Sequence, residues 1–201
     1  MLAIAAVAGA VGLDLPGIRI LLGEPPASAS PTIGVSPSGV PGSRLGLGQL
    51  VTLDAARDQT GRPLPLPDEP TLGPPDAVYV DPAHADQVAL VWAERPDLPA
   101  SLEPGVGLIL MSFDGRLHPS FATKVIGPGT TLERVRVDGD PGFWISGTPH
   151  FFFYESAAST FIEDSRRWIG DALIWSDGTT TWRLESALGR DGAVRIATSL
   201  P

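Results

Sequence analysis

The sequence contains no cysteine and no asparagine, and it has a single lysine, Lys124. The absence of cysteine excludes disulfide bonds, thiol nucleophiles, thiolate metal sites and iron–sulfur ligation. Cysteine usage therefore says nothing about the redox compartment. The near-absence of lysine and the abundance of Ala, Gly, Pro and Arg are typical of a high-GC genome.

Positive charge is also scarce. The chain has 14 Lys and Arg residues against 23 Asp and Glu residues, a formal net charge of −9 and a pI of about 4.7. Only the pair Arg166-Arg167 concentrates positive charge. A chain this acidic repels a phosphate backbone and an anionic membrane surface, so we expect no nucleic-acid partner.

Apolar residues, in contrast, are plentiful. Hydrophobic residues make up 43% of the 201 residues and charged residues 18%, which is a globular composition. With 23 Gly and 21 Pro, the chain favours many turns and short elements over a helical bundle. Its length predicts one domain with a core of its own and a tail.

The N-terminal segment, residues 1–13, carries no charge. At helical rise it spans only about 20 Å, less than the roughly 30 Å of a hydrocarbon core. Three interpretations are open: the outer end of a membrane helix that starts upstream, a buried helix of the domain, or a signal peptide without a basic region. We expect the first. The chain then divides into an apolar membrane-anchor stub (1–22), a Pro/Ser/Gly-rich linker (23–44) and an extracytoplasmic domain (45–201).

The domain begins with a short predicted helix and a loop. Residues 50–61 form the helix, with Thr52 as N-cap and Gly61 as its stop. The proline-rich residues 63–75 are predicted to form a loop or an edge.

After Asp76 the hydrophobic period becomes two, which predicts a run of strands. Asp138 to Gly142 supplies a turn, and the strand before it is expected to have one solvent-exposed face. The predicted strands are Ala77–Val80, Gln87–Ala93, Val106–Phe113, Thr131–Val137, Phe143–Ser146 and Phe151–Glu155.

The clearest local pattern is a hairpin over residues 171–185. Asp177-Gly178 fits a two-residue type I′ turn, which sets Trp175 opposite Thr180 and Leu173 opposite Trp182. One face then carries Leu173, Trp175, Trp182 and Leu184, while Arg183 and Glu185 point away from it.

A helix over residues 190–200 ends the chain, with Ala193, Ile196, Ala197 and Leu200 on one stripe. Strands followed by a terminal helix predict an α+β fold. The expected architecture is a mostly antiparallel twisted sheet with a short N-terminal helix and a C-terminal helix packed on it.

Five phrases of the sequence resemble one family: LGLGQLVTLDAAR (45–57), LGPPDAVYVDP (72–82), DPGFWISGTPHFFFY (140–154), ALIWSDGTTTWRLESAL (172–188) and VRIATSL (194–200). This family is the uncharacterised extracytoplasmic domain that follows the membrane helix in anti-sigma-factor-like proteins of high-GC bacteria. The tail is its most specific part: a tryptophan strand, a Gly turn, an Arg-Leu-Glu strand and an Ile-Ala-x-Ser-Leu helix.

The resemblance implies a sensory or regulatory role rather than catalysis. In such proteins a cytoplasmic part binds a sigma factor, often through a zinc module with His and Cys ligands. This chain has no cysteine and no such part, so it resembles the outer, sensing half alone. Regulation would need a protein partner or a missing segment.

Motifs for catalysis are weak. The histidines His84, His118 and His150 lack the spacing that places two imidazoles on one helical face, so we expect no metal site. His150 with Ser146 and nearby aspartates lacks the G-x-S-x-G elbow of a Ser-His-Asp hydrolase. The carboxylates are scattered and no phosphate-binding loop occurs. We expect no catalytic residues and no cofactor.

Aromatic side chains are dense around one strand connection, residues 143–154. They form either the core of a small sheet or an apolar cleft for a lipid or peptide. The candidate ligand or partner surface consists of Trp144, Phe151, Phe153 and Tyr154. We expect a non-enzymatic, membrane-tethered regulatory domain; the alternative is a binding module for an apolar ligand, lipid or peptide with a half-barrel-like sheet.

Overall fold

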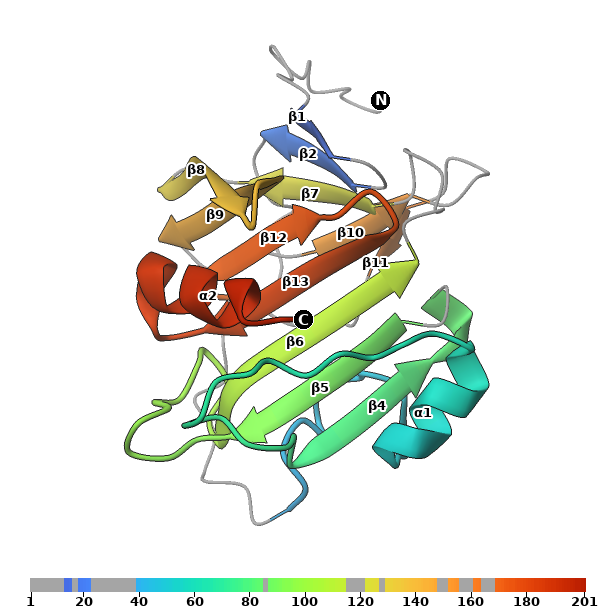
Figure 1. The fold of residues 1–201 in the computed structure, drawn as a ribbon. Helices are drawn as coiled ribbons and strands as arrows, with labels where there is room; N and C mark the ends of the chain where they lie inside the picture. Colours follow the sequence, from blue (N-terminus) through green and yellow to red (C-terminus); the bar gives the residue numbers. More distant parts are fainter. Residues whose placement is uncertain are drawn as a thin grey trace, which may run out of the picture.

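An eight-stranded antiparallel sheet forms the body of the protein (Figure 1). The computed structural model describes residues 13–15, 18–22, 39–84, 87–114, 122–126, 129–147, 152–155, 161–163 and 169–201. The strand order is β3-β4-β5-β6-β13-β12-β9-β8. The strands are β3 (Gln49–Val51), β4 (Ala77–Asp81), β5 (Gln87–Ala93), β6 (Val106–Asp114), β8 (Thr130–Val137), β9 (Asp140–Gly147), β12 (Ala172–Ser176) and β13 (Thr180–Ser186).

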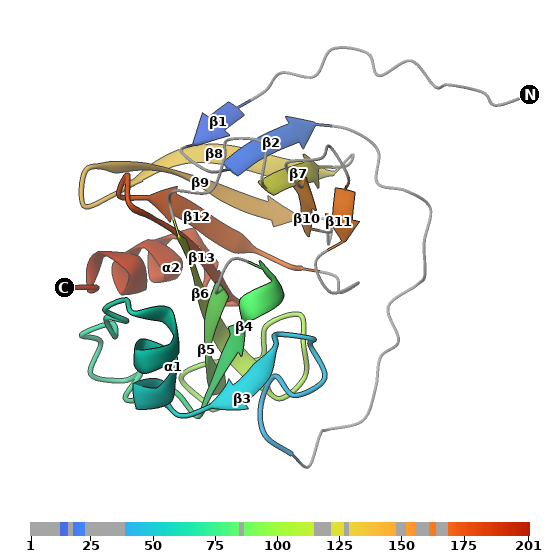
Figure 2. The same ribbon diagram turned by 90° about the vertical axis from the view of Figure 1, so that its right-hand side faces the viewer.

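A smaller sheet of five strands lies at the β8–β9 side of the larger one (Figure 2). Its order is β1-β2-β7-β10-β11, with β2 parallel to β7. The strands are β1 (Leu13–Leu15), β2 (Ile18–Leu22), β7 (Ala122–Ile126), β10 (Phe152–Glu155) and β11 (Phe161–Glu163). The segment expected to be a membrane anchor, residues 1–22, thus contributes two strands here, and residues 1–12 lie outside the described part.

Two α-helices and one 3-10 turn, η1 (Pro82–His84), complete the described elements. α1 spans Leu53–Thr60, and its caps confirm the prediction: Thr52 accepts a hydrogen bond from the Ala55 N–H at 3.1 Å, and Gly61 closes the helix at a φ of 62°. Leu50, expected in the helix, lies instead in β3 because it pairs with Tyr79 of β4. In the part of the chain that is described, no helix combines the length and apolar character that crossing a membrane requires.

Both helices pack on the same face of the large sheet. α2 (Gly189–Thr198) buries Ala193, Ile196 and Ala197, three members of its predicted stripe, and Ala56 of α1 is buried in the same cluster. The opposite face packs against the segment that precedes β3, through Leu45 and Leu47. The Tyr79 hydroxyl donates a hydrogen bond to the Pro41 carbonyl at 2.8 Å, and burial raises the pKa of Tyr79. Packing against the sheet therefore begins within the stretch expected to be a linker.

The α+β architecture and the predicted strands are confirmed. β5 has the expected bounds, and β4, β6, β8, β9 and β10 each lie within a few residues of theirs. Their alternating or continuous apolar patterns suit strands that are buried on one or both faces. The residues 63–69 form no helix or strand, as their prolines predict.

The register predicted for the β12–β13 hairpin is wrong by two residues, although the predicted faces are right. Trp175 lies opposite Trp182, and Leu173 lies opposite Leu184. The connection is longer than two residues because Asp177 does not adopt the positive φ of a type I′ turn; only Gly178 does, at 88°. A shift of two residues preserves which face each side chain occupies.

The turn with two successive positive φ values occurs elsewhere. Asp138 and Gly139 have φ values of 53° and 94° and connect β8 to β9, where Val137 lies opposite Asp140. Aspartate tolerates this conformation better than most residues, and glycine adopts it without cost. The turn is thus shorter than the predicted Asp138–Gly142.

A charged pair lies inside the sheet. Arg183 and Glu185 point away from the tryptophan face, as predicted, but they are 0% and 5% exposed rather than solvated. Their side chains form an ion pair at 2.7 Å, and an Arg183 N–H group also contacts the Met111 sulfur. Because both charges are removed from water, their ion pair offsets part of the cost of burying them.

We therefore predict that Arg183→Met destabilises the fold by roughly 3–5 kcal/mol, since it removes the positive charge that is paired with the buried Glu185 carboxylate. Arg183→Met combined with Glu185→Leu should recover most of this loss. Urea unfolding of both variants measures the coupling. Arg190→Met, which breaks an exposed pair with Glu133, serves as the control and should have a small effect. A double variant no more stable than Arg183→Met would contradict the prediction.

Candidate functional site

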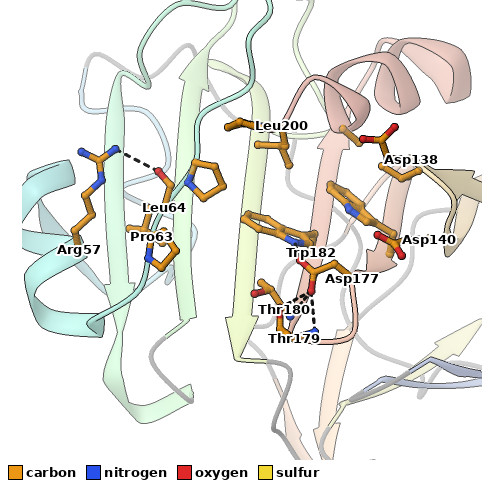
Figure 3. Close-up of a pocket in the computed structure, with 15 residues that line it drawn as sticks. Arg57, Pro63, Leu64, Asp138, Asp140, Asp177, Thr179, Thr180, Trp182 and Leu200 are labelled. Carbon is orange, nitrogen blue, oxygen red and sulfur yellow. Dashed lines mark hydrogen bonds between the residues drawn. The ribbon is translucent and has the colours of Figure 1, made fainter.

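A groove of about 620 Å³ opens beside α2, between the tips of two hairpins and a proline-rich loop (Figure 3). Four separate segments line it. They are the α1 side chain Arg57 with the loop Pro63, Leu64 and Pro65; the β8–β9 tip with Val137, Asp138 and Asp140; the β12–β13 hairpin with Trp175, Asp177, Thr179, Thr180 and Trp182; and the C-terminal residues Ala197, Leu200 and Pro201.

Two stacked indoles form the base of the groove. The rings of Trp175 and Trp182 lie 6.1 Å apart at an interplanar angle of 14°, and the two residues are 3% and 7% exposed. Gly142 of β9 pairs with Trp175, and a Cβ at Gly142 would lie 2.9 Å from the Trp175 Cβ. The absence of a side chain at Gly142 therefore lets Trp175 lie close against the sheet.

One wall of the groove is apolar. Pro63, Leu64 and Pro65 face it from one side, and Leu200 from the end of α2. The Arg57 guanidinium donates a hydrogen bond to the Leu64 carbonyl at 3.3 Å and pairs with Asp54 at 3.2 Å. Arg57 thus holds the proline-rich loop against α1 (Figure 3).

The other wall carries three carboxylates, Asp138, Asp140 and Asp177. Asp138 and Asp177 are exposed, and Asp140 is half-buried. Among the described residues, no Lys or Arg side chain pairs with any of the three. Arg136, the nearest arginine in sequence, donates instead to the Gly139 carbonyl. This side of the groove therefore carries negative charge that has no ion-pair partner in the described part of the chain.

Asp177 is held by an unusual number of donors. Its Oδ1 accepts the N–H groups of Thr179 and Thr180 at 2.8 and 2.7 Å and the Thr179 hydroxyl at 2.7 Å, and its Oδ2 accepts the Trp182 indole N–H at 3.3 Å. Partial burial opposes ionisation, but these hydrogen bonds outweigh it and lower the pKa of Asp177 below its usual value. The hairpin tip is thereby fixed around a charged carboxylate.

The residues predicted as a ligand surface are dispersed. Trp144 is buried in the main sheet on the helix side, in the same cluster as Trp175. Phe153 and Tyr154 lie in β10, a strand of the smaller sheet, and Phe151 lies outside the described residues. Trp144 and β10 are thus in different sheets, and Trp144 does not line the groove.

The histidines and Ser146 form no described constellation. His84 ends η1, whereas His118 and His150 lie outside the described residues. Ser146 lies in β9 opposite Thr131. Within the described ranges, no group of three or more His, Cys, Asp or Glu side chains is placed to hold a metal ion.

A second hollow of about 300 Å³ lies at the other end of β13, and its carboxylates are already engaged. It is lined by Glu103, Asp171 and Glu185 among small residues. Asp171 accepts the Gly147 N–H at 3.2 Å, and Glu185 pairs with Arg183. The groove at Trp182 is the larger of the two hollows, and none of its aspartates forms an ion pair with a described Lys or Arg side chain, so it is the better candidate.

The sequence predicts the separate elements that line the groove, but it does not predict that they lie close together in the fold. The tryptophan hairpin and the Asp138 turn were both predicted, whereas their proximity to Pro63–Pro65 depends on long-range packing. The one usable signal was that two tryptophans share a strand face beside two Asp-Gly turns. Comparisons with family models, curated proteins and solved structures give no match to the chain.

We predict that Asp177→Ala destabilises the protein by roughly 1–2 kcal/mol at neutral pH, because four donors lose their acceptor. The folded-state pKa of Asp177 is lowered, so its stabilisation is present above the usual aspartate pKa of about 3.9 and is lost as pH falls through the folded value. The difference in unfolding free energy between wild type and variant should therefore shrink between about pH 5 and pH 2.

Urea unfolding over that pH range measures this difference. Asp58→Ala, which removes an exposed carboxylate from α1 and not from the groove, is the control. A wild-type advantage over Asp177→Ala that is the same at pH 2 and pH 7 would contradict the assignment.

Proposed function

We propose that this chain is the extracytoplasmic sensory domain of a membrane-tethered, anti-sigma-factor-like regulatory protein, and that it acts by binding rather than by catalysis. One observation carries the proposal. The tail with the most specific family resemblance, residues 172–200, forms β12, β13 and α2, and these same elements supply the indole base and one wall of the groove.

The chemistry of the groove suits recognition. It combines two indoles, proline and leucine side chains, threonine hydroxyls and three carboxylates around one open space. Sites of this kind bind through apolar contact and a few placed polar groups. A sensory domain responds to a ligand only if the ligand binds one of its states better than the other, and the groove is a surface at which a ligand could bind.

A binding module for an apolar ligand is the second candidate. The loop Pro63–Pro65, Leu200 and the indoles give the groove an apolar side that favours an uncharged lipid or peptide. In that case the carboxylates would lie at the rim and contribute little to affinity.

Membrane tethering is tested with the natural gene carrying a C-terminal epitope tag. We expect the tagged protein to sediment with membranes and the tag to be removed when protease is added to intact spheroplasts. Recovery of the tag in the soluble fraction, or its protection from external protease, would contradict the proposed location.

Regulation is tested by comparing transcripts of a deletion strain with complemented strains. We expect deletion to change a defined set of promoters, and wild type and Asp97→Lys to restore them. Asp140→Lys, which adds a cation to the groove, should fail to restore them although it carries the same charge change. A deletion that alters no coherent promoter set would refute a regulatory role.

A further inference from the structure

The distribution of charge around the groove is one-sided. Asp138, Asp140 and Asp177 line one wall, and the lining cation, Arg57, lies on the opposite side (Figure 3). Arg57 is already engaged by Asp54 and the Leu64 carbonyl. The structure thus places negative charge without a paired cation, among the described residues, beside an apolar surface.

Part of the acidic wall is ordered before any ligand arrives. Four hydrogen bonds fix Asp177, and the positive-φ turn at Asp138 and Gly139 is braced by the hydrogen bond from Arg136 to the Gly139 carbonyl. A site whose groups are already ordered loses little conformational freedom on binding. A ligand cation would therefore meet the Asp177 carboxylate already in place, next to a braced turn that carries Asp138.

The shape of the groove selects the size of the ligand. A volume of about 620 Å³ falls within the range of roughly 300–1,000 Å³ that is typical of ligand sites. A single small cation would leave the Pro63–Pro65 wall and the edges of Trp175 and Trp182 uncovered. A ligand that fills the groove must carry positive charge and apolar surface together.

Nucleic acid does not meet this requirement, because its phosphates would face the three aspartates and a net charge of −9. A peptide segment with an arginine between apolar residues does. The guanidinium can bind a carboxylate through two parallel hydrogen bonds, and its proline or leucine neighbours can pack against the opposite wall.

We infer that the groove binds a basic, proline- or leucine-containing segment of a partner protein, with an arginine held among Asp138, Asp140 and Asp177. This inference rests on the proposed binding function and names its ligand class. Complementary charge also predicts faster association and a strong dependence of affinity on salt.

The test uses the full 201-residue chain and three synthetic peptides with capped ends: Pro-Leu-Arg-Leu-Pro, and the same sequence with Gln or with Glu in place of Arg. Calorimetry measures affinity, and NMR of the indole N–H groups locates binding. We expect the Arg peptide to bind at least roughly fivefold more tightly than the Gln peptide, and the Glu peptide not to bind. Raising the salt concentration from about 0.05 M to about 0.5 M should weaken the Arg complex selectively.

A matched pair of variants tests the location. Asp138→Asn with Asp140→Asn should weaken the Arg peptide roughly tenfold and leave the Gln peptide unchanged, and asparagine suits the positive φ at position 138. Asp58→Asn with Asp97→Asn makes the same charge change away from the groove and should leave binding within about twofold.

Equal affinity for the Arg and Gln peptides would overturn the inference in favour of an uncharged apolar ligand. Absence of binding at millimolar peptide, or indole shifts unaffected by the groove variants, would also overturn it. These outcomes are independent of the membrane and transcript experiments. If the peptide test fails but the membrane and transcript experiments succeed, only the proposed ligand class is wrong. If the peptide binds but those experiments fail, only the proposed regulatory role is wrong.

Discussion

The pairing of β13 with β6 is the constraint on which the rest of the structure depends. It joins the sheet half built from β3 to β6 with the half built from β8, β9 and β12, over seven residue pairs from Thr180 opposite Asp114 to Ser186 opposite Leu108. The partners are some 70 residues apart in the chain, so closing this pair costs considerable loop entropy. Burial of apolar side chains on both faces offsets that cost: Trp182 and Leu184 pack on the α2 side, and Ile109 and Met111 lie in the cluster on the opposite face. Because α2 follows β13 after two residues, the same pairing also places α2 and therefore one wall of the groove.

Local chemistry was sufficient to predict much of this fold. Thr52 and Gly61 predict the two ends of α1. The Thr52 side chain accepts a hydrogen bond from a free N–H group at the start of the helix, and the Gly61 N–H donates to a carbonyl at its end. The run Gln87–Ala93 reads as a strand buried on both faces, since six of its seven residues are apolar and none is Gly or Pro. The common face of Trp175 and Trp182 follows from period two alone, and it survives a change of register by an even number of residues.

Features that depend on long-range partners were not predictable in the same way. The hairpin register was misjudged because Asp177 acts as a hydrogen-bond acceptor for the turn rather than as a residue with positive φ.

The burial of Arg183 and Glu185 was missed because alternation identifies two faces but does not say whether the second is covered. Leu50 joined β3 because its pairing with Tyr79 outweighs a weak helical tendency. The aromatic run around residues 143–154 suggested one cluster, but its strands belong to different sheets.

The groove illustrates how a binding surface can arise from elements with structural roles of their own. Gly142 makes room for Trp175, the two indoles stack, and Asp177 ties the second indole to the hairpin tip. Each of these interactions stabilises the end of the sheet, and together they place a carboxylate beside an aromatic base. Asp138 and Asp140 add further negative charge to this wall. In the described part of the fold neither forms an ion pair, so neither gains stabilisation from one. Exposure to water screens the repulsion between these charges, and Asp138 also suits the positive φ of its turn; their position next to an open apolar groove is the basis of the proposed arginine-binding role.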